Sequence, residues 1–381
     1  MVISRVERWF NRKPLERRGK RTSEFEAAFR YQQFGVIDVV RRIQGEALAL
    51  FGFGPVESSY GVIASGPYWR LRDYDTVHRS RSVLIVAAPI KRPYIWDLMP
   101  PISAIRRCLD AGLRVSLLEW LPASETTCSV GIAECVQAIS AALDKIGSAA
   151  GARKPILMGH SLGGTLAAIY AALEPETVGG LVLLSAPLCF RAGESVFRDA
   201  LVSLVPKPIS ESRPYPGSIL SQASVAASPA TFIFWRYMDA MISAADRRAM
   251  DTYARVERWA LDEVAVPGKL VGEIVEQLYR ENRFCRGILE IESKTVGPAN
   301  LSAPILAVVN MADLVAPLHA VSPIGEVLRR KKFHIIEYPG ENGVCLQHIG
   351  ILVGRKAHAQ VWPQIIKWIE IQKEPRRKSI T

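Results

Sequence analysis

A serine lies between two glycines in a stretch where residues 159–163 read Gly-His-Ser-Leu-Gly. An apolar run precedes this stretch, and a run of small residues that favours a helix follows it. The pattern G-x-S-x-G between a strand and a helix is typical of a nucleophile elbow, where a strained backbone exposes the serine hydroxyl. Such a turn has no room for bulk at Gly159 and Gly163. We therefore predict that Ser161 is a catalytic nucleophile; the alternative is a glycine-rich turn with a bystander serine.

A serine hydroxyl is a poor nucleophile at neutral pH, so it needs a base, and the base needs an orienting carboxylate. The expected chain order is serine, then an acid directly after a strand, then histidine. The segment 310–313 directly follows the apolar run 305–309, and Asp313 at its end is the predicted acid. It could also cap the turn that follows. Three other aspartates lie in helical patterns and fit less well, namely Asp110, Asp144 and Asp239.

Six histidines are available as the base. His348 follows a turn-rich segment after the last predicted strand and precedes a helical pattern, which is where the base is expected. The alternative for His348 is a loop histidine bonded to the backbone. The others are in less suitable places: His78 before the first core strand, His160 in the variable position of the elbow, His334 in the last strand, and His319 and His358 in helices.

Acyl transfer from a serine also needs backbone donors that stabilise the oxyanion. One donor is expected to be the N–H of Leu162, which follows the nucleophile. The other should come from the loop after the strand at 83–88. Pro89 opens that loop and has no N–H, so we predict Ile90 or Lys91 as the second donor.

Short apolar runs alternate with helical patterns from about residue 60 onward. These runs show little polar alternation, as expected for parallel strands that are covered on both faces. The pattern predicts an α/β fold with a mostly parallel central sheet and helices on both faces. Strands are expected at 83–88, 115–118, 156–158, 181–184, 305–309 and 333–336.

The segment 187–298 interrupts this rhythm and is rich in helix formers and aromatic residues. An insertion of this size between two strands is typical of a helical cap that closes over an active site and excludes water. A plain extra layer of helices is the alternative. The predicted organisation is a basic, helical N-terminal extension over 1–58, a core over 59–186 and 299–372, the cap, and a basic tail over 373–381.

The chain carries a net charge of +11, and basic residues crowd both of its ends. Charged termini are usually solvated tails. The functional alternative is that the basic N-terminus is attracted to an anionic lipid surface. Nucleic acid is not expected as a partner, because no recognition motif accompanies the charge.

Neither an export signal nor a membrane-spanning run is expected from this sequence. The six cysteines show no metal or disulfide spacing. We therefore expect reduced thiols in a cytoplasmic protein, with no metal and no cofactor.

Three segments resemble motifs of the polyhydroxyalkanoate synthase branch of the α/β-hydrolase superfamily, closest to its short-subunit type. Residues 89–98 read P-I-K-R-P-Y-I-W-D-L, and residues 279–283 read Y-R-E-N-R, similar to the family's Y-x-E-N-R/K-L. The third joins residues 313–317 to residues 348–351, which are similar to D-x-x-V-P-P and G-H-I-G-I. The resemblance covers roughly residues 55–372. It implies an α/β-hydrolase fold, hydroxyacyl-coenzyme A or a polyester as substrate, a granule surface, and a homodimer or a synthase-type partner subunit.

Two features depart from the family pattern. Ser161 stands where the resemblance implies a cysteine, and the loop before His348 is longer, with Gln347 in place of a glycine. Cys345 lies in that loop, away from the elbow, and is not expected to be the nucleophile. An acyl-cysteine keeps the activation of a thioester, whereas an acyl-serine reacts more slowly with alcohols, and water is the abundant acceptor.

We therefore expect a serine hydrolase of hydroxyacyl esters or thioesters that works through an acyl-Ser161 intermediate. One alternative is a hydroxyacyl-coenzyme A transferase or polyhydroxyalkanoate synthase subunit. The other is a non-catalytic granule-associated protein, against which the complete set of Ser161, Asp313 and His348 argues.

Overall fold

The computed structural model describes residues 33–74, 81–150, 154–205, 207–328 and 332–372. The predicted basic start of the chain, His78 and the predicted basic tail lie outside these described residues.

The centre of the molecule is a sheet whose eight described strands follow the order β1-β2-β4-β3-β5-β6-β9-β10. The pairs β1–β2 and β2–β4 are antiparallel, and all other pairs in the sheet are parallel. The prediction of a mostly parallel sheet is confirmed. The strands are β1 (Gly61–Ser65), β2 (Trp69–Asp73), β3 (Ser82–Val86), β4 (Arg114–Trp120), β5 (Ile156–His160), β6 (Gly180–Leu184), β9 (Ile305–Asn310) and β10 (Phe333–Tyr338).

The antiparallel strands β1 and β2 were not predicted. In β2, arginines alternate with apolar residues, so the strand does not show the continuous apolar run of its neighbours. Its charges are paired within the sheet: the Nε atoms of Arg70 and Arg72 lie 2.5 and 2.6 Å from Oε2 of Glu119 on β4.

Side chains on both faces of the parallel strands are buried. In β3, Leu84 and Val86 pack into one hydrophobic core, whereas Val83 and Ile85 pack into a second core on the opposite face. This explains the continuous apolar runs in the sequence. Strand β10 is the exception, since it lies at the edge of the sheet and most of its side chains are not buried.

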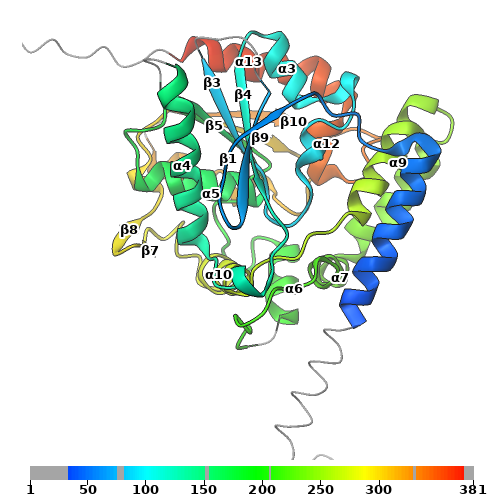
Figure 1. The fold of residues 1–381 in the computed structure, drawn as a ribbon, viewed down its shortest axis with the longest axis horizontal. Coiled ribbons are helices and arrows are strands. Elements are labelled where there is room, and N and C mark those ends of the chain that lie inside the picture. Colours follow the sequence, from blue (N-terminus) through cyan, green and yellow to red (C-terminus); the bar gives the residue numbers. More distant parts are fainter. Residues whose placement is uncertain (1–32, 75–80, 151–153, 206, 329–331, 373–381) are drawn as a thin grey trace, which may run out of the picture.

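Helices cover both faces of the sheet (Figure 1). Helices α4 and α5 contribute to the first core, and α3, α12 and α13 to the second. Among the described residues, no helix is both long enough and apolar enough to cross a membrane. The bounds are α3 (Ala104–Asp110), α4 (Ile132–Ala150), α5 (Leu162–Leu173), α11 (Pro323–Val327), α12 (Gly350–Val353) and α13 (Trp362–Ile371). Shorter helical turns are η3 (Pro93–Trp96), η4 (Pro100–Ile102), η5 (Glu125–Thr127), η8 (Pro298–Asn300), η9 (Leu318–Ala320), η11 (Gln347–Ile349) and η12 (Ala357–Val361).

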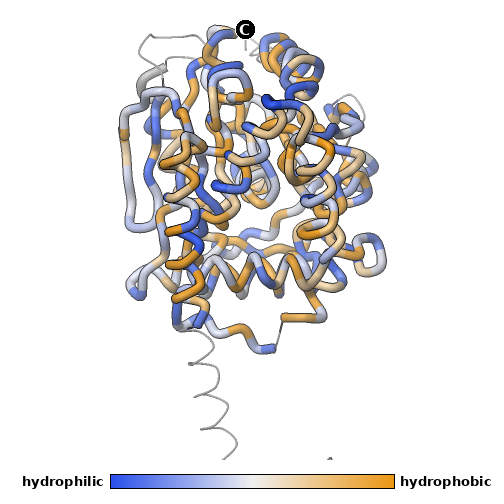
Figure 2. The backbone as a smooth tube through the Cα atoms, turned by 90° about the vertical axis from the view of Figure 1, so that its right-hand side faces the viewer, coloured by the Kyte–Doolittle hydropathy of each residue, from blue (hydrophilic) through white to orange (hydrophobic). Residues whose placement is uncertain are grey.

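The segment between β6 and β9 is mostly helical. Figure 2 shows hydrophobic and hydrophilic residues alternating along the helices turned toward the viewer, as expected where one face of a helix is packed. A short hairpin formed by β7 (Leu289–Ile291) and β8 (Lys294–Val296) was not predicted. The helices are α6 (Val196–Leu204), α7 (Gly217–Ala227), η6 (Ala230–Phe234), α8 (Trp235–Ser243), α9 (Arg247–Leu261), α10 (Gly268–Glu273) and η7 (Ile274–Arg280).

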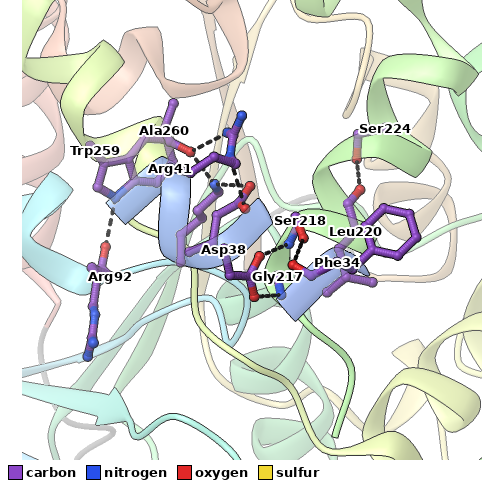
Figure 3. Close-up of polar contacts among 12 residues, drawn as sticks. Phe34, Asp38, Arg41, Arg92, Gly217, Ser218, Leu220, Ser224, Trp259 and Ala260 are labelled. Atoms are coloured by element: carbon purple, nitrogen blue, oxygen red, sulfur yellow. Dashed lines mark hydrogen bonds and ion pairs between the residues drawn. The ribbon is translucent and has the colours of Figure 1, made fainter. Parts of the chain in front are cut away.

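The helix over residues 33–48, which ends in the π-helical turn η2 (Ala49–Phe53), packs against this insertion (Figures 1 and 3). The carboxylate of Asp38 accepts hydrogen bonds from the backbone N–H groups of Gly217 and Ser218, at 3.1 and 2.9 Å. These are the first residues of α7, whose own N-cap, Pro216, offers no side-chain acceptor. Asp38 therefore caps a helix that lies far away in the sequence.

Replacing Asp38 with alanine is expected to lower the free energy of unfolding by about 1 kcal/mol, because α7 loses its N-terminal acceptor. Urea unfolding followed by circular dichroism measures the change. Glu46→Ala, at an exposed position of the same helix, is the control. Equal stability of the two variants would contradict the capping role.

One expectation about the cysteines is wrong. Cys189, in the loop after β6, and Cys285, after η7, form a disulfide with a Cα–Cα distance of 5.1 Å. They are 96 residues apart, so local spacing could not indicate the pairing. The expectation of a cytoplasmic location rests in part on six reduced thiols. Because disulfides are rare in reducing compartments, that argument no longer holds.

Candidate active site

Ser161 lies in a sharp turn between β5 and α5. Its φ is 54° and its ψ is −135°, a conformation that is strained for a residue with a side chain. A Cβ on Gly163 would overlap the carbonyl oxygen of Val86, and a Cβ on Gly159 would overlap the backbone of Gly164. Glycine is thus required at 163 because the first turn of α5 passes close to the end of β3, and at 159 because that turn folds back onto the end of β5.

The structure brings the three predicted catalytic side chains together. Nε2 of His348 lies 2.9 Å from Oγ of Ser161, and Nδ1 of His348 lies 2.7 Å from Oδ2 of Asp313. A carboxylate can only accept a hydrogen bond, so His348 carries its proton on Nδ1 and its Nε2 can accept the proton of Ser161. This arrangement can activate the serine hydroxyl as a nucleophile.

The side chain of Asp313 is fully buried, three residues after the end of β9. Its second oxygen, Oδ1, accepts the backbone N–H groups of Val315 and Ala316, at 2.8 and 3.2 Å. Burial alone would raise the pKa of Asp313. The proximity of His348 and the two backbone donors outweigh burial and hold that pKa below its ordinary value. Asp313 therefore stays ionised where it must orient His348, and it caps the following turn as the sequence also suggested.

His160 fixes the position of the base, a role that its sequence position did not suggest. Its Nε2 donates to the backbone carbonyl of His348 at 2.8 Å, and the two rings lie 4.8 Å apart. Burial, followed by the proximity of His348, lowers the pKa of His160 to about 3. His160 is therefore neutral near neutral pH and adds no positive charge beside the imidazolium that forms on His348.

Asn310, the last residue of β9, supports the same loop from the sheet. Its Nδ2 donates to the carbonyl of Gln347 at 2.7 Å, and its Oδ1 accepts the N–H of Ala312 at 3.0 Å. Both the acid loop and the base loop are thus attached to one buried side chain at the end of a strand.

Replacing His160 with phenylalanine keeps the ring but removes the donor, so the buried carbonyl of His348 is left unpaired at a cost of about 1–3 kcal/mol. The unpaired carbonyl shifts the loop that carries His348 away from Ser161. An increase of about 1.4 kcal/mol in the activation barrier would lower the rate of ester cleavage about tenfold. A chromogenic ester measures that rate.

A second measurement tests the buried neutral imidazole. Below its ordinary pKa of 6.5, His160 takes up a proton in the unfolded chain but not in the folded protein until about pH 3. Wild-type stability should therefore decrease as the pH falls through this range, and His160→Phe should flatten the decrease. An unchanged rate with an unchanged pH dependence would contradict the role of His160.

The predicted oxyanion donors lie at the start of α5 and in the loop after β3. Leu162 is the first residue of α5, so its N–H has no carbonyl partner within the helix and is available to an oxyanion. Lys91 forms an isolated antiparallel bridge with Glu263, and its Nζ lies 3.1 Å from Oε1 of that residue. The contact fixes the loop that also holds Ile90. Which of these two loop residues supplies the second donor stays a prediction.

Cys345 lies close to the base loop but is unsuited to nucleophilic attack. Burial raises the pKa of its thiol well above the ordinary value, and Sγ donates to Oε1 of Glu257 at 3.2 Å. Among the other described histidines, His319 lies in η9, His334 in β10 and His358 in η12, where His358 bonds to the carbonyl of Leu352 at 2.7 Å.

A small pocket opens beside the acid loop, between the core and the insertion. Val315 and His319 line it from the core, and Phe190, Arg198 and Tyr279 line it from the insertion. Val315, two residues beyond Asp313 in the sequence, thus lies in the same pocket as aromatic rings and an arginine of the insertion.

A family model for the alpha/beta hydrolase fold matches residues 122–341. The poly(3-hydroxyalkanoate) polymerase subunit PhaC of Haloferax mediterranei is 27% identical over 302 residues, which cover 77% of this chain and 59% of that protein. The PhaC subunit of Allochromatium vinosum is 24% identical over 289 residues, which cover 75% of this chain and 80% of that protein. The match to the Haloarcula marismortui PhaC subunit likewise covers only 60% of that relative's length.

Solved structures show the same fold at low sequence identity. A lipase candidate from Sulfolobus solfataricus has a TM-score of 0.52 and 15% identity, covering 82% of this chain and 93% of that chain. A structure from a study of carboxylesterases of Nitrososphaera gargenis has a TM-score of 0.50 and 15% identity, covering 82% and 98% of the two chains.

Proposed function

Because this chain belongs to the α/β-hydrolase fold family, as a polyhydroxyalkanoate synthase-like member, we propose that it transfers hydroxyacyl groups through an ester formed on Ser161. The observation that carries the proposal is the hydrogen-bonded series from Asp313 through His348 to Ser161. The same series would serve any acyl donor, so the substrate class rests on the relatives.

The first half of the reaction would acylate the enzyme. Oγ of Ser161 attacks the carbonyl carbon of a hydroxyacyl thioester while Nε2 of His348 takes the hydroxyl proton. The C–S bond then breaks, and His348 returns the proton to the leaving sulfur. The N–H of Leu162 would stabilise the oxyanion formed between these steps.

The second half would pass the acyl group to an acceptor. A hydroxyl group of another hydroxyacyl unit attacks the acyl-Ser161 carbonyl and gives its proton to His348. The new ester leaves, and Ser161 recovers the proton. The names of the relatives, which are polymerase subunits, favour this acceptor over the hydrolysis expected from the sequence.

Hydrolysis remains a second candidate because of one specific residue. Ser161 stands where the resemblance implies cysteine, and an acyl-serine lacks the thioester activation that helps transfer to an alcohol. Water would then be the acceptor, and the product would be a free hydroxy acid.

Incubation with 3-hydroxyacyl-coenzyme A distinguishes the two candidates. Intact-protein mass spectrometry is expected to show a hydroxyacyl adduct on Ser161 together with release of free coenzyme A. An adduct that grows in steps of one hydroxyacyl unit supports transfer, and free hydroxy acid with a short-lived adduct supports hydrolysis. Release of no coenzyme A and formation of no adduct would exclude this substrate class.

The proposal extends to partners and location. A polyester or an acyl thioester would be the substrate. The resemblance also implies association with a granule surface, and either a homodimer or a complex with a synthase-type partner subunit. The basic N-terminus could attract an anionic lipid surface, and its residues lie outside the described part of the chain. Comparing turnover and size-exclusion behaviour with and without added polyester granules tests these associations.

A further inference from the structure

Helix α8 turns polar side chains toward the protein. Asp239 is buried, with only 7% of its surface exposed, whereas Trp235, Tyr237 and Met241 are 56–72% exposed. A helix on the surface of a globular protein normally packs its apolar side inward. A carboxylate buried in this way costs free energy unless specific donors compensate it.

The donors to Asp239 belong to the loop that carries the base. Its Oδ1 accepts the N–H of Gly343 and its Oδ2 accepts the N–H of Cys345, both at 2.7 Å. Gly343 and Cys345 precede His348 by only a few residues, between β10 and η11. A single side chain of the insertion therefore uses both of its oxygens to hold the loop of the catalytic histidine.

The loop backbone needs this support. Gly343 has a φ of 84° and Cys345 a φ of 65°, and the left-handed conformation is unfavourable for a residue such as Cys345 that has a side chain. The insertion makes a second contact with Cys345, because Sγ of Cys345 donates a hydrogen bond to Glu257 of α9. Glu257 is in turn paired with Arg236 of α8.

The same loop is held by the core at its other end. The carbonyl of Gln347 accepts from Asn310, and the carbonyl of His348 accepts from His160. His348 therefore lies between two sets of anchors, one in the sheet and one in the insertion.

We infer that Asp239 is a positioning residue that couples α8 to the catalytic base, so that Ser161 is activated only while α8 is seated on the loop. This inference rests on the proposed role of Ser161 and His348. It assigns Asp239 no contact with substrate, since the carboxylate acts through the backbone of residues 343–345.

The rate at which a fluorophosphonate probe labels Ser161 tests the inference. The probe reports activation of the serine by His348, whatever acyl donor or acceptor the enzyme uses. Asp239→Asn keeps the size of the side chain but presents an amide donor to one backbone N–H. Labelling is expected to slow by about tenfold to a hundredfold, because small displacements of a catalytic group have effects of this size.

The matched control is Asp251→Asn, on α9. Asp251 pairs with Arg255 at 3.2 Å within the same helix and is partly exposed. This variant makes the same chemical change in the insertion without touching the base loop, so its labelling rate should equal that of the wild type.

A double-mutant cycle separates positioning from general stability. If Asp239 acts through His348, Asp239→Asn should cause no further slowing in a His348→Ala background. The same fold-change in both backgrounds, or wild-type labelling by folded Asp239→Asn, would overturn the inference. Failure of the wild type itself to label would instead refute the proposed function.

If Asp239→Asn does not fold, hydrogen exchange of the wild-type protein decides. The amides of Gly343 and Cys345 should exchange as slowly as those of α8, because both donate to Asp239. Exchange at the rate of an open loop would overturn the coupling.

Discussion

Replacing Ser161 with alanine is expected to lower the acyl-transfer rate by about a millionfold, the size of effect seen when a triad nucleophile is removed. Alanine keeps the Cβ that already occupies the strained turn, so the φ of 54° is no less favourable than in the wild type. The change removes only Oγ and its hydrogen bond to His348. Release of coenzyme A from a hydroxyacyl thioester measures the rate, and mass spectrometry should show no protein adduct.

Ser185 provides the control for this prediction. It directly follows β6, has a φ of 43° and is fully buried, and its hydroxyl has no hydrogen-bond partner among the described residues. Ser185→Ala should therefore change turnover by less than about threefold, since no hydrogen bond is lost. Turnover that survives in Ser161→Ala would place the nucleophile elsewhere.

Replacing Asp313 with asparagine is expected to lower the rate by about ten-thousandfold, as for the equivalent change in a serine triad. The amide keeps the shape and can still accept from Val315 and Ala316 through one oxygen. Its NH₂ group would face Nδ1 of His348, so the ring would no longer be held with its proton on Nδ1. The proton acceptor opposite Ser161 is thereby lost. Ester cleavage and probe labelling should fall together.

The pH dependence of stability gives an independent test of Asp313. Its folded pKa lies below the ordinary value of 3.8, so its ionised form stabilises the folded protein above that value. This contribution is lost as the pH falls through the lowered folded pKa. Asp313→Asn removes the contribution and should unfold with a weaker dependence on acid pH. Wild-type kinetics in this variant would mean that His348 is oriented by another group.

The three predicted catalytic residues could be found in the sequence because each follows a local rule. Ser161 lies in a glycine-flanked turn, Asp313 lies in the loop just after a buried strand, and His348 follows the last strand. Parallel strands bring these positions to the same edge of the sheet, so chain order and strand ends predict their proximity.

The supporting residues follow no local rule. Asp239 is 104 residues away from Gly343 in the sequence, and Asp38 is 179 residues away from Gly217. Their roles depend on how the insertion and the N-terminal helix pack, which periodicity alone does not determine. The role of His160 depends on the backbone of His348, 188 residues away, which the elbow pattern does not indicate. Strand β2 shows no continuous apolar run because it carries two arginines, and only the folded sheet places them beside Glu119 of β4.

The bond between Cys189 and Cys285 has a mechanical consequence. These cysteines lie near the start and the end of the insertion, so the bond closes most of the insertion into a covalent ring whose two ends are fixed to each other. The disulfide keeps these ends together whatever the state of the hydrogen bonds between the insertion and the core. Loss of contacts such as those of Asp239 would therefore not separate the two ends of the insertion from each other.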